Sequence, residues 1–349
     1  MRWIKIVFYL LLTFLVIWFI LNFQLVIYGF NQLRKQVDII YSSRPITEVL
    51  EDSATPDSVI AKLKLVEKII LFAKDSLKLD DGGNYQKYYD QGGKPILWVL
   101  TACEPYSFTS YKWNFPILGK VSYKGFFKYD TGLKEKEELS KLGYDTEYSE
   151  VSAWSTLGWF NDTVLSGMLR RSEGMLAELL IHELTHSTVY LKSSVDFNEN
   201  LASAIGEAGA ERYLRFHYGD SSSQMISYLN RKHDYSIFSN HLLNGTKLLE
   251  KEYIKSKSDH DSVRFRKKSE LISEIIAGLD TIEFKQAGQY RNIFKEKMPN
   301  NAYFMNFIRY DAQKEEMKHE LNTRFGGDIR AYLDFVKDEF SSKPVKKTQ

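Results

Sequence analysis

An uncharged run near the N-terminus constrains this chain more than any other feature. Residues 6–28 (IVFYLLLTFLVIWFILNFQLVIY) contain no charged side chain, and their number exceeds the ~20 residues that a membrane-spanning helix needs. Basic residues flank both ends, so positive charge alone does not orient the segment. A cleaved signal peptide is the rival interpretation, but its apolar core usually has only about 7–15 residues and ends at an A-x-A-like site. The sequence therefore favours an uncleaved transmembrane helix within an anchor at residues 1–30.

The rest of the chain, residues 31–349, is long enough for one large domain or two small ones. The sequence has 47 Lys and Arg against 45 Asp and Glu, and Arg2 with Lys5 accounts for the excess, so the body is neutral. A neutral body argues against a nucleic-acid partner bound through its phosphates. The single cysteine, Cys103, excludes an internal disulfide and any metal site built from several cysteines. A bound metal would therefore need His and carboxylate ligands.

Apolar spacing in the body predicts an α+β fold in which helices predominate. A helix is expected over 57–79, and the chain after Ser172 has mostly helical patterns. Extended segments, which together predict a small sheet, are expected at 96–100, 121–127 and 148–160. The stretch 225–298 is long, charged and poor in Gly and Pro. We expect it to form a helical excursion packed on the body.

The motif His182-Glu183-Leu184-Thr185-His186 lies in an apolar stretch without Pro or Gly. Two histidines four residues apart share one face of a helix, so His182 and His186 can bind the same divalent metal. Glu183 can reach a metal-activated water without being a ligand itself. Three ordinary hydrogen-bonded side chains on a buried helix are the alternative, which is disfavoured because apolar helices rarely carry such groups without partners.

A third metal ligand is expected downstream, because catalytic zinc usually has three protein ligands and one open position. Glu199 begins a predicted helix that runs to about residue 218, and a returning helix could bring it against the motif. Glu207 is the main competitor on that helix, followed by Glu211 and His217. We therefore expect Zn²⁺ as the cofactor, with Glu199 as the favoured third ligand and Glu207 still open.

The arrangement of His182 to His186 followed by Asn198-Glu199-x-x-Ala202 resembles the gluzincin metallopeptidases. The chain is more closely similar to a bacterial family of predicted aminopeptidases along nearly its whole body. The matching segments are Arg44-Pro45-Ile46, Trp113-x-Phe115-Pro116-x-x-Gly119, Tyr123-x-Gly125-Phe126-Phe127, Ser155 to Phe160, His182 to Ala202, and Asn300-Asn301-Ala302 with Tyr310. The resemblance implies a zincin-like metallopeptidase domain over 31–349, on the periplasmic or extracytoplasmic side of the cell membrane.

The leading functional hypothesis is hydrolysis of peptides, with an aminopeptidase implied by the resemblance. Glu183 is the expected general base. Tyr310 is a candidate hydrogen-bond donor to the oxyanion, with aromatic packing as an equal alternative. The expected partners are a peptide substrate and the membrane. The other hypotheses are a membrane-tethered binding or scaffold protein with structural zinc, and a zinc hydrolase of a non-peptide substrate.

Overall fold

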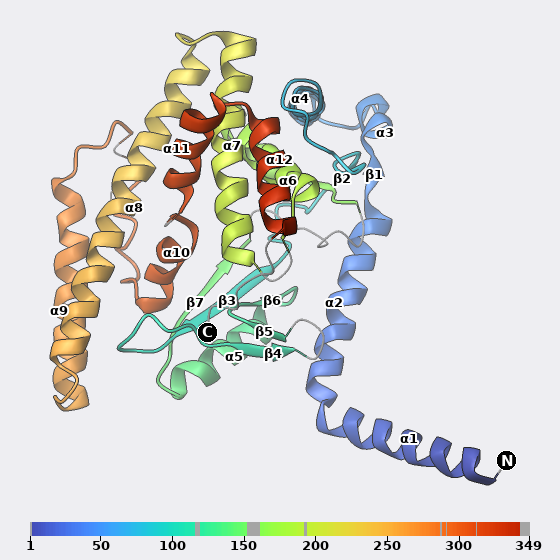
Figure 1. The fold of residues 1–349 in the computed structure, drawn as a ribbon, viewed down its shortest axis with the longest axis vertical. Helices are drawn as coiled ribbons and strands as arrows, with labels where there is room; N and C mark the ends of the chain where they lie inside the picture. The colour runs from blue at the N-terminus through green and yellow to red at the C-terminus, as the bar shows by residue number, and fades with distance from the viewer. Residues whose placement is uncertain are drawn as a thin grey trace.

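The computed structural model describes residues 2–115, 119–151, 161–191, 194–286, 288–290, 292–311 and 313–342. In these ranges the fold is mostly helical and has three small sheets (Figure 1). The α-helices are α1 (Arg2–Leu21), α2 (Phe23–Ser42), α3 (Ile46–Glu51), α4 (Asp57–Asp75), α5 (Tyr129–Lys141), α6 (Glu173–Thr188), α7 (Val195–Tyr218), α8 (Ser223–Lys255), α9 (Asp261–Gly278), α10 (Asn301–Asp311), α11 (Lys314–Phe325) and α12 (Ile329–Ser342). The strands are β1 (Arg44–Pro45), β2 (Lys87–Tyr89), β3 (Trp98–Cys103), β4 (Trp113–Phe115), β5 (Gly119–Val121), β6 (Lys124–Phe126), β7 (Asp145–Glu150) and β8 (Val164–Leu165).

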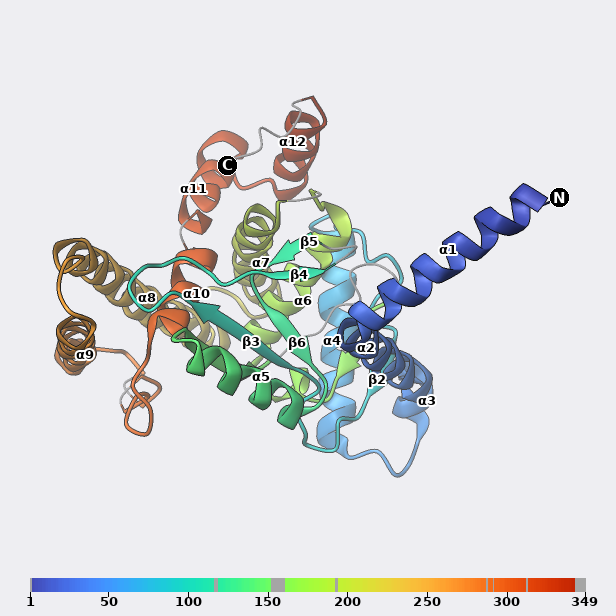
Figure 2. The same cartoon turned by 90° about the horizontal axis from the view of Figure 1, so that it is seen from below.

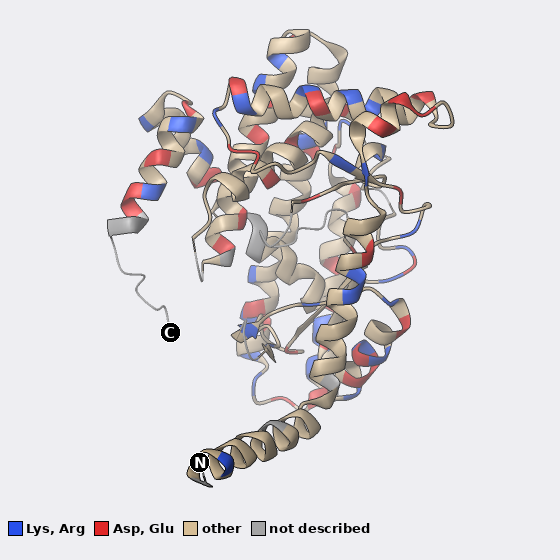
Figure 3. Ribbon diagram, turned by 90° about the vertical axis from the view of Figure 1, so that its right-hand side faces the viewer, with Lys and Arg blue, Asp and Glu red and all other residues tan. Residues whose placement is uncertain are grey.

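The uncharged N-terminal run forms two helices rather than one. Helix α1 projects away from the body in both ribbon views (Figures 1 and 2), and charged residues are confined to its start (Figure 3). Its segment Trp3–Leu21 is long and apolar enough to cross a membrane, a test that a signal sequence also passes, and none of it is buried. The helix ends before Asn22, whose side-chain amide donates a 2.8 Å hydrogen bond to the Trp18 carbonyl.

Helix α2 packs on the body, so the expected span of residues 6–28 is divided between two helices, and the anchor boundary at residue 30 stays a prediction. The Tyr28 hydroxyl and the Gln32 amide each donate a 2.7 Å hydrogen bond to the carbonyl of Gly125. The Tyr28 ring also lies against Phe115 and Phe126. Apolar residues after Asn22 are therefore used for packing against protein, and the apolar helix that stands apart from the body ends at Leu21.

The main core is helical and surrounds α6. Helices α4, α6, α7, α11 and α12 contribute buried side chains to one cluster, and α6 with α7 is the most extensively packed pair of elements. A small sheet of order β1-β2-β8 lies beside this core, with β2 antiparallel to β1 and parallel to β8. The predicted helix over 57–79 is confirmed as α4, four residues shorter at its C-terminal end.

The second sheet has the order β6-β3-β7 and is antiparallel throughout (Figure 1). The strand expected at 96–100 is displaced to β3, and the segment expected at 121–127 is divided between β5 and β6. The region expected to be extended at 148–160 begins earlier, as β7, and residues 152–160 lie outside the described residues. The predominance of helix with a small amount of sheet is as the sequence predicts.

The predicted helical excursion corresponds to α8 and α9, which lie side by side at the edge of the molecule (Figures 1 and 2). These helices share a separate apolar cluster with α10. Its buried members include Phe238, Leu242, Ile275, Phe304 and Phe307. The excursion therefore carries its own core and leaves the core around α6 to the other helices.

Candidate metal centre

Helix α6 presents the two motif histidines at the surface of the main core. Its opposite side is anchored by buried residues such as Leu180, Ile181 and Leu184. Because His182 and His186 are four residues apart, they lie about one turn from each other on one side of the helix. Their side chains are 20% and 18% exposed, so both rings remain accessible from solvent. The helix thus fixes two imidazoles without burying them completely.

The turn from α6 into α7 is closed by Asn198. The side-chain oxygen Oδ1 of Asn198 accepts a 2.9 Å hydrogen bond from the Leu191 N–H, and the side-chain Nδ2 donates a 2.8 Å hydrogen bond to the Leu191 carbonyl. Asn198 is itself buried. Because the next residue is Glu199, this pair of bonds holds the start of α7 beside the end of α6 and places the Glu199 carboxylate near the histidines.

Two glycines let α7 approach α6 closely. A Cβ atom on Gly206 would lie 2.9 Å from the backbone carbonyl oxygen of Glu178 and 3.2 Å from the Cβ of His182. On Gly209 it would lie 2.7 Å from the side chain of Ile181. Gly206 is seven residues after Glu199, about two helical turns, so Gly206 and Glu199 lie on the same face of α7, the face toward α6. The absence of these side chains therefore brings the carboxylate within reach of both rings.

Replacing Gly206 with Ala is expected to destabilise the protein by about 1–3 kcal/mol, because the methyl group would contact a backbone oxygen that cannot rotate away. The measurement is the thermal midpoint of the full chain in detergent. The matched control is Gly29→Ala in helix α2, where nothing lies within 4 Å of the added Cβ and the midpoint should not fall. Equal midpoints for Gly206→Ala and wild type would contradict the close approach.

The ligand atoms of His182, His186 and Glu199 form a compact triangle. The two Nε2 atoms are 3.2 Å apart. Glu199 Oε2 is 3.5 Å from the His182 Nε2, and Glu199 Oε1 is 3.6 Å from the His186 Nε2. Tetrahedral zinc with bonds of about 2.0–2.2 Å separates its ligand atoms by roughly 3.3–3.6 Å. The three side chains therefore fit a divalent ion with one open position.

The electrostatics of the triangle suit a cation. Burial, and next the charge of His182, lower the pKa of His186 to about 4, so its ring is neutral as a metal ligand must be. Burial opposes ionisation of Glu199, but its hydrogen bond with His182 holds the pKa of the carboxyl below its usual value. Burial likewise opposes the charged form of His182, yet the hydrogen bond with Glu199 and neighbouring carboxylates raise its pKa. The buried His186 Nδ1 has no hydrogen-bond partner.

Glu183 lies beside the triangle but is not part of it. The group that can hold a metal contains the two histidines and Glu199 only, among the residues the structure describes. Burial, and then the charges of Asp162 and Glu199, raise the pKa of Glu183 to about 7, although the charge of His182 opposes this. No hydrogen bond or ion pair within the described ranges holds this carboxylate. It is therefore available to exchange a proton with a molecule at the site.

Sequence reasoning missed two groups close to Glu183, the Tyr85 phenol and the Asp162 carboxylate. The buried Tyr85 has a φ of 60°, a left-handed conformation that is unusual for a residue other than Gly. Burial, followed by the charges of Glu183 and Asp162, raises the pKa of its phenol well above the usual value. The positive φ is not visible in the sequence, although the neighbouring turn at Gly82 and Gly83 is.

The structure places the competing ligand Glu207 elsewhere. Its carboxylate is 4% exposed and contacts three ammonium groups, at 2.6 Å from Lys232, 2.9 Å from Lys314 and 2.8 Å from Lys318. Burial opposes its charge, but the lysines lower the pKa of Glu207 to about 2. It therefore forms ion pairs with lysines of α8 and α11 and is not part of the group that can hold a metal.

The remaining candidates are not brought into the triangle. Glu211 is absent from the metal-binding group. His217 lies among aromatic rings, 4.5 Å from the ring centroid of Tyr213 and 6.0 Å from that of Phe72. Tyr310 belongs to helix α10, but its side chain, like the segment Ser155 to Phe160, lies outside the described residues. The oxyanion role of Tyr310 stays a prediction.

The fold and site together define a helix-rich protein in which one helix carries two histidines and the next carries a carboxylate facing them. A family model described as "Putative aminopeptidase" matches residues 27–349. The chain therefore belongs to this family, and the match begins within α2 and excludes α1. The family's description points to a peptidase acting on peptide substrates. Searches of curated proteins and of solved structures gave no match.

Proposed function

We propose that this protein is a zinc-dependent metallopeptidase of the gluzincin type, held in the cell membrane by α1 with its body on the extracytoplasmic side. One observation carries the proposal: the ligand atoms of His182, His186 and Glu199 converge to mutual distances of 3.2–3.6 Å. Family membership supports peptides as substrates. The aminopeptidase activity rests on the family's description.

The chain's own residues suggest how the reaction would proceed. Bound zinc supplies Lewis-acid activation of water and of the scissile carbonyl. Glu183 then accepts a proton from the attacking water and delivers it to the leaving amine. Its position one residue after His182 keeps the carboxyl beside the ligands, and no described residue holds it in place, which leaves it free to move a proton. His182 and His186 stay neutral ligands while Glu199 balances one positive charge.

The exposure of the ligands favours a catalytic over a structural role. Structural zinc is usually closed by four protein ligands, whereas catalytic zinc keeps one position open. Here the described residues supply three ligands, and the side chains are 18–28% exposed. A small molecule can therefore reach the position that a fourth protein ligand would otherwise occupy.

The experiment that tests this function combines metal analysis with turnover. Full-length protein in detergent should contain about one zinc per chain and cleave a peptide pool. A chelator should stop cleavage and added zinc should restore it. Glu199→Ala should lower zinc affinity by more than about 100-fold, since even residues outside the ligand shell contribute 10–100-fold.

The matched control is Glu211→Ala on the same helix, which should keep both zinc and activity. Zinc-loaded wild type that cleaves no peptide would contradict the peptidase proposal. Full activity after exhaustive removal of zinc would contradict the metal-dependent mechanism.

A further inference from the structure

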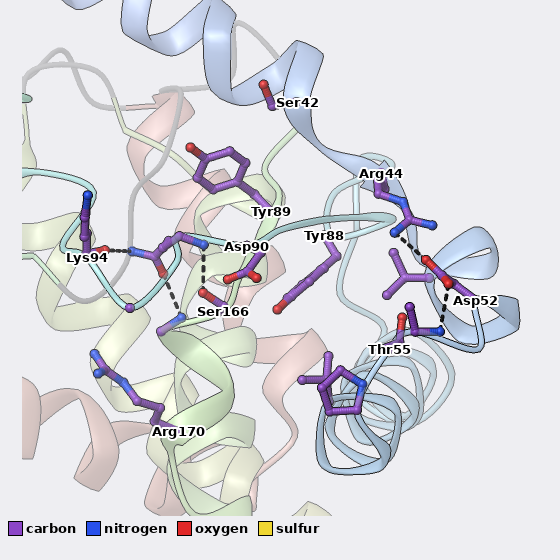
Figure 4. Close-up of a pocket in the computed structure, with 17 residues that line it drawn as sticks. Ser42, Arg44, Asp52, Thr55, Tyr88, Tyr89, Asp90, Lys94, Ser166 and Arg170 are labelled. Atoms are coloured by element: carbon purple, nitrogen blue, oxygen red, sulfur yellow. Dashed lines mark hydrogen bonds and ion pairs between the residues drawn. The ribbon is translucent and has the colours of Figure 1, made fainter.

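A cavity of about 340 Å³ opens at the N-terminal end of α6, on the helix that carries the motif histidines. Three arginines line it, Arg170, Arg171 and Arg231. It adjoins a larger cavity of about 740 Å³, with which it shares Gln91, Gly167 and Arg170 (Figure 4). The two cavities are therefore neighbours that share a wall made of these residues.

The three arginines have no acidic partner among the residues that the structure describes. Within the described ranges, none of their guanidinium groups makes a hydrogen bond or an ion pair, and no dashed line reaches Arg170 in Figure 4. By contrast, Arg44 in the neighbouring cavity pairs with Asp52 at 2.8 Å. Unpaired arginines gathered around one hollow leave a positive potential in it.

The nearby carboxylates do not neutralise this charge. Glu150 is the one acid among the described lining residues, against three arginines. Glu178 lies close enough to influence Arg171, but its oxygens already accept hydrogen bonds from the Tyr228 hydroxyl and the Lys232 ammonium. The described lining residues therefore carry a net charge of +2.

Arg171 is held in surroundings that favour an incoming anion. Burial, followed by the positive charges of Arg231 and Arg170, lowers the pKa of Arg171. The first N–H groups of α6 also face this end, and Ser172 makes no side-chain capping bond to them. A carboxylate entering the pocket would relieve the repulsion and find planar guanidinium donors suited to its geometry.

The pocket lies on the same side of α6 as Glu183. Ser172 lines it and precedes Glu183 by eleven residues, which is close to three full turns. That separation is ~16 Å between the backbone positions along the helix axis, which is an upper limit, because the charges of Arg171 and Glu183 influence each other and their side chains therefore lie closer. An extended peptide rises about 3.3 Å per residue, so roughly four or five residues span the distance.

We infer that the pocket of Arg170, Arg171 and Arg231 binds a carboxylate of the peptide substrate, four or five residues from the scissile bond. The inference rests on the proposed peptidase function and specifies its substrate class as short peptides with a negative charge at that end. The carboxylate is supplied by a free C-terminus or by an acidic side chain at the same distance.

The test compares three hexapeptides of otherwise equal sequence: one with a free C-terminus, one amidated, and one amidated with Asp as its last residue. Wild-type protein should cleave the free acid at least ~10-fold more efficiently, by kcat/KM, than the neutral amide, because charge-assisted hydrogen bonds are lost in the amide. If the amidated Asp peptide is cleaved as efficiently as the free acid, a side-chain carboxylate also binds in the pocket. If it is cleaved only as slowly as the neutral amide, the pocket accepts a free C-terminus alone.

Variants assign the effect to the pocket. Arg231 is exposed, so Arg231→Gln should fold normally. This variant should lower the ratio of kcat/KM for the free acid to kcat/KM for the amide toward one. Arg171→Gln should lower that ratio more strongly. Arg266→Gln on α9 is the matched control, since this arginine is 68% exposed and remote from the pocket, and it should leave the ratio at the wild-type value. An unchanged ratio in Arg231→Gln and Arg171→Gln would overturn the assignment.

A binding measurement distinguishes failure of this inference from failure of the proposed peptidase function. Calorimetry with Glu183→Gln protein, in which turnover is prevented, should show at least ~10-fold tighter binding of the free acid than of the amide. Equal binding, or equal cleavage by wild type, would overturn the inference even if the protein proves to be a peptidase. Acid-selective binding without any cleavage by wild type would instead overturn the proposed function alone.

Discussion

Glu183→Gln is expected to lower peptide turnover by about 10²–10⁴-fold while zinc content stays at the wild-type level. Glutamine keeps the size of the side chain but cannot accept the proton of the attacking water. The ligand triangle does not include Glu183, so the metal should be retained. The measurements are kcat on a peptide substrate and zinc per chain, both on full-length protein in detergent.

The control for this change is Glu173→Gln in the first turn of the same helix. Its carboxylate accepts a hydrogen bond from the Tyr218 hydroxyl, far along α6 from the histidines, so turnover should be nearly unchanged. Wild-type turnover in Glu183→Gln would show that another group moves the proton. Loss of zinc in that variant would show that Glu183 helps to bind the metal.

Glu207→Gln is expected to destabilise the protein by about 3–5 kcal/mol, the cost of removing one partner from a buried charge pair. The carboxylate is 4% exposed and contacts Lys232, Lys314 and Lys318. A neutral amide would leave these ammonium groups close together without the buried carboxylate that they share, although Lys232 would keep its contact with Glu178. The measurement is the free energy of unfolding in denaturant, with zinc content expected to stay unchanged in the folded protein.

The stabilisation by Glu207 should also depend on pH in a defined direction. Its pKa is about 2 in the folded protein, below the ~4.3 of an unfolded glutamate. A lowered pKa means that the stabilisation is complete above the unfolded value and is lost as pH falls through the folded value. The difference in stability between wild type and Glu207→Gln should therefore shrink between about pH 4 and pH 2.

Asp334→Asn provides the comparison for an exposed ion pair. Asp334 is 2.8 Å from Arg330, but both side chains are almost half exposed. Such pairs contribute about 0–1 kcal/mol, so this variant should remain close to wild type. If Glu207→Gln were equally mild, the lysine cluster would not be a determinant of stability.

The two histidines are predictable from sequence because their spacing alone fixes their common face on α6. The proposed third ligand is less secure from sequence, because Glu199 is favoured there but Glu207 lies on the same helix and stays open. Two sets of contacts distinguish Glu199 from Glu207. Asn198 bonds to Leu191 and holds Glu199 near the histidines, whereas lysines of α8 and α11 pair with Glu207. These are contacts between distant parts of the chain, which local patterns do not encode.

The N-terminal region shows the same limit. Apolar residues in lipid and apolar residues packed on protein look alike in composition, so the sequence could not show that the run is divided at Asn22. The arginine pocket is also hidden, since Arg231 comes from α8, 60 residues after Arg171. By contrast, the helical character of the excursion was predictable because it depends on local spacing and on the lack of Gly and Pro.

The double hydrogen bond from Tyr28 and Gln32 to Gly125 has a consequence for where the enzyme can work. If α1 lies in a bilayer, only Asn22 separates this helix from α2, which is bonded to the body. If α1 crosses a membrane, the body would be joined to the span by one short link, and the proposed metal site would stay close to the membrane surface. Peptides released close to the membrane surface would be the ones within its range.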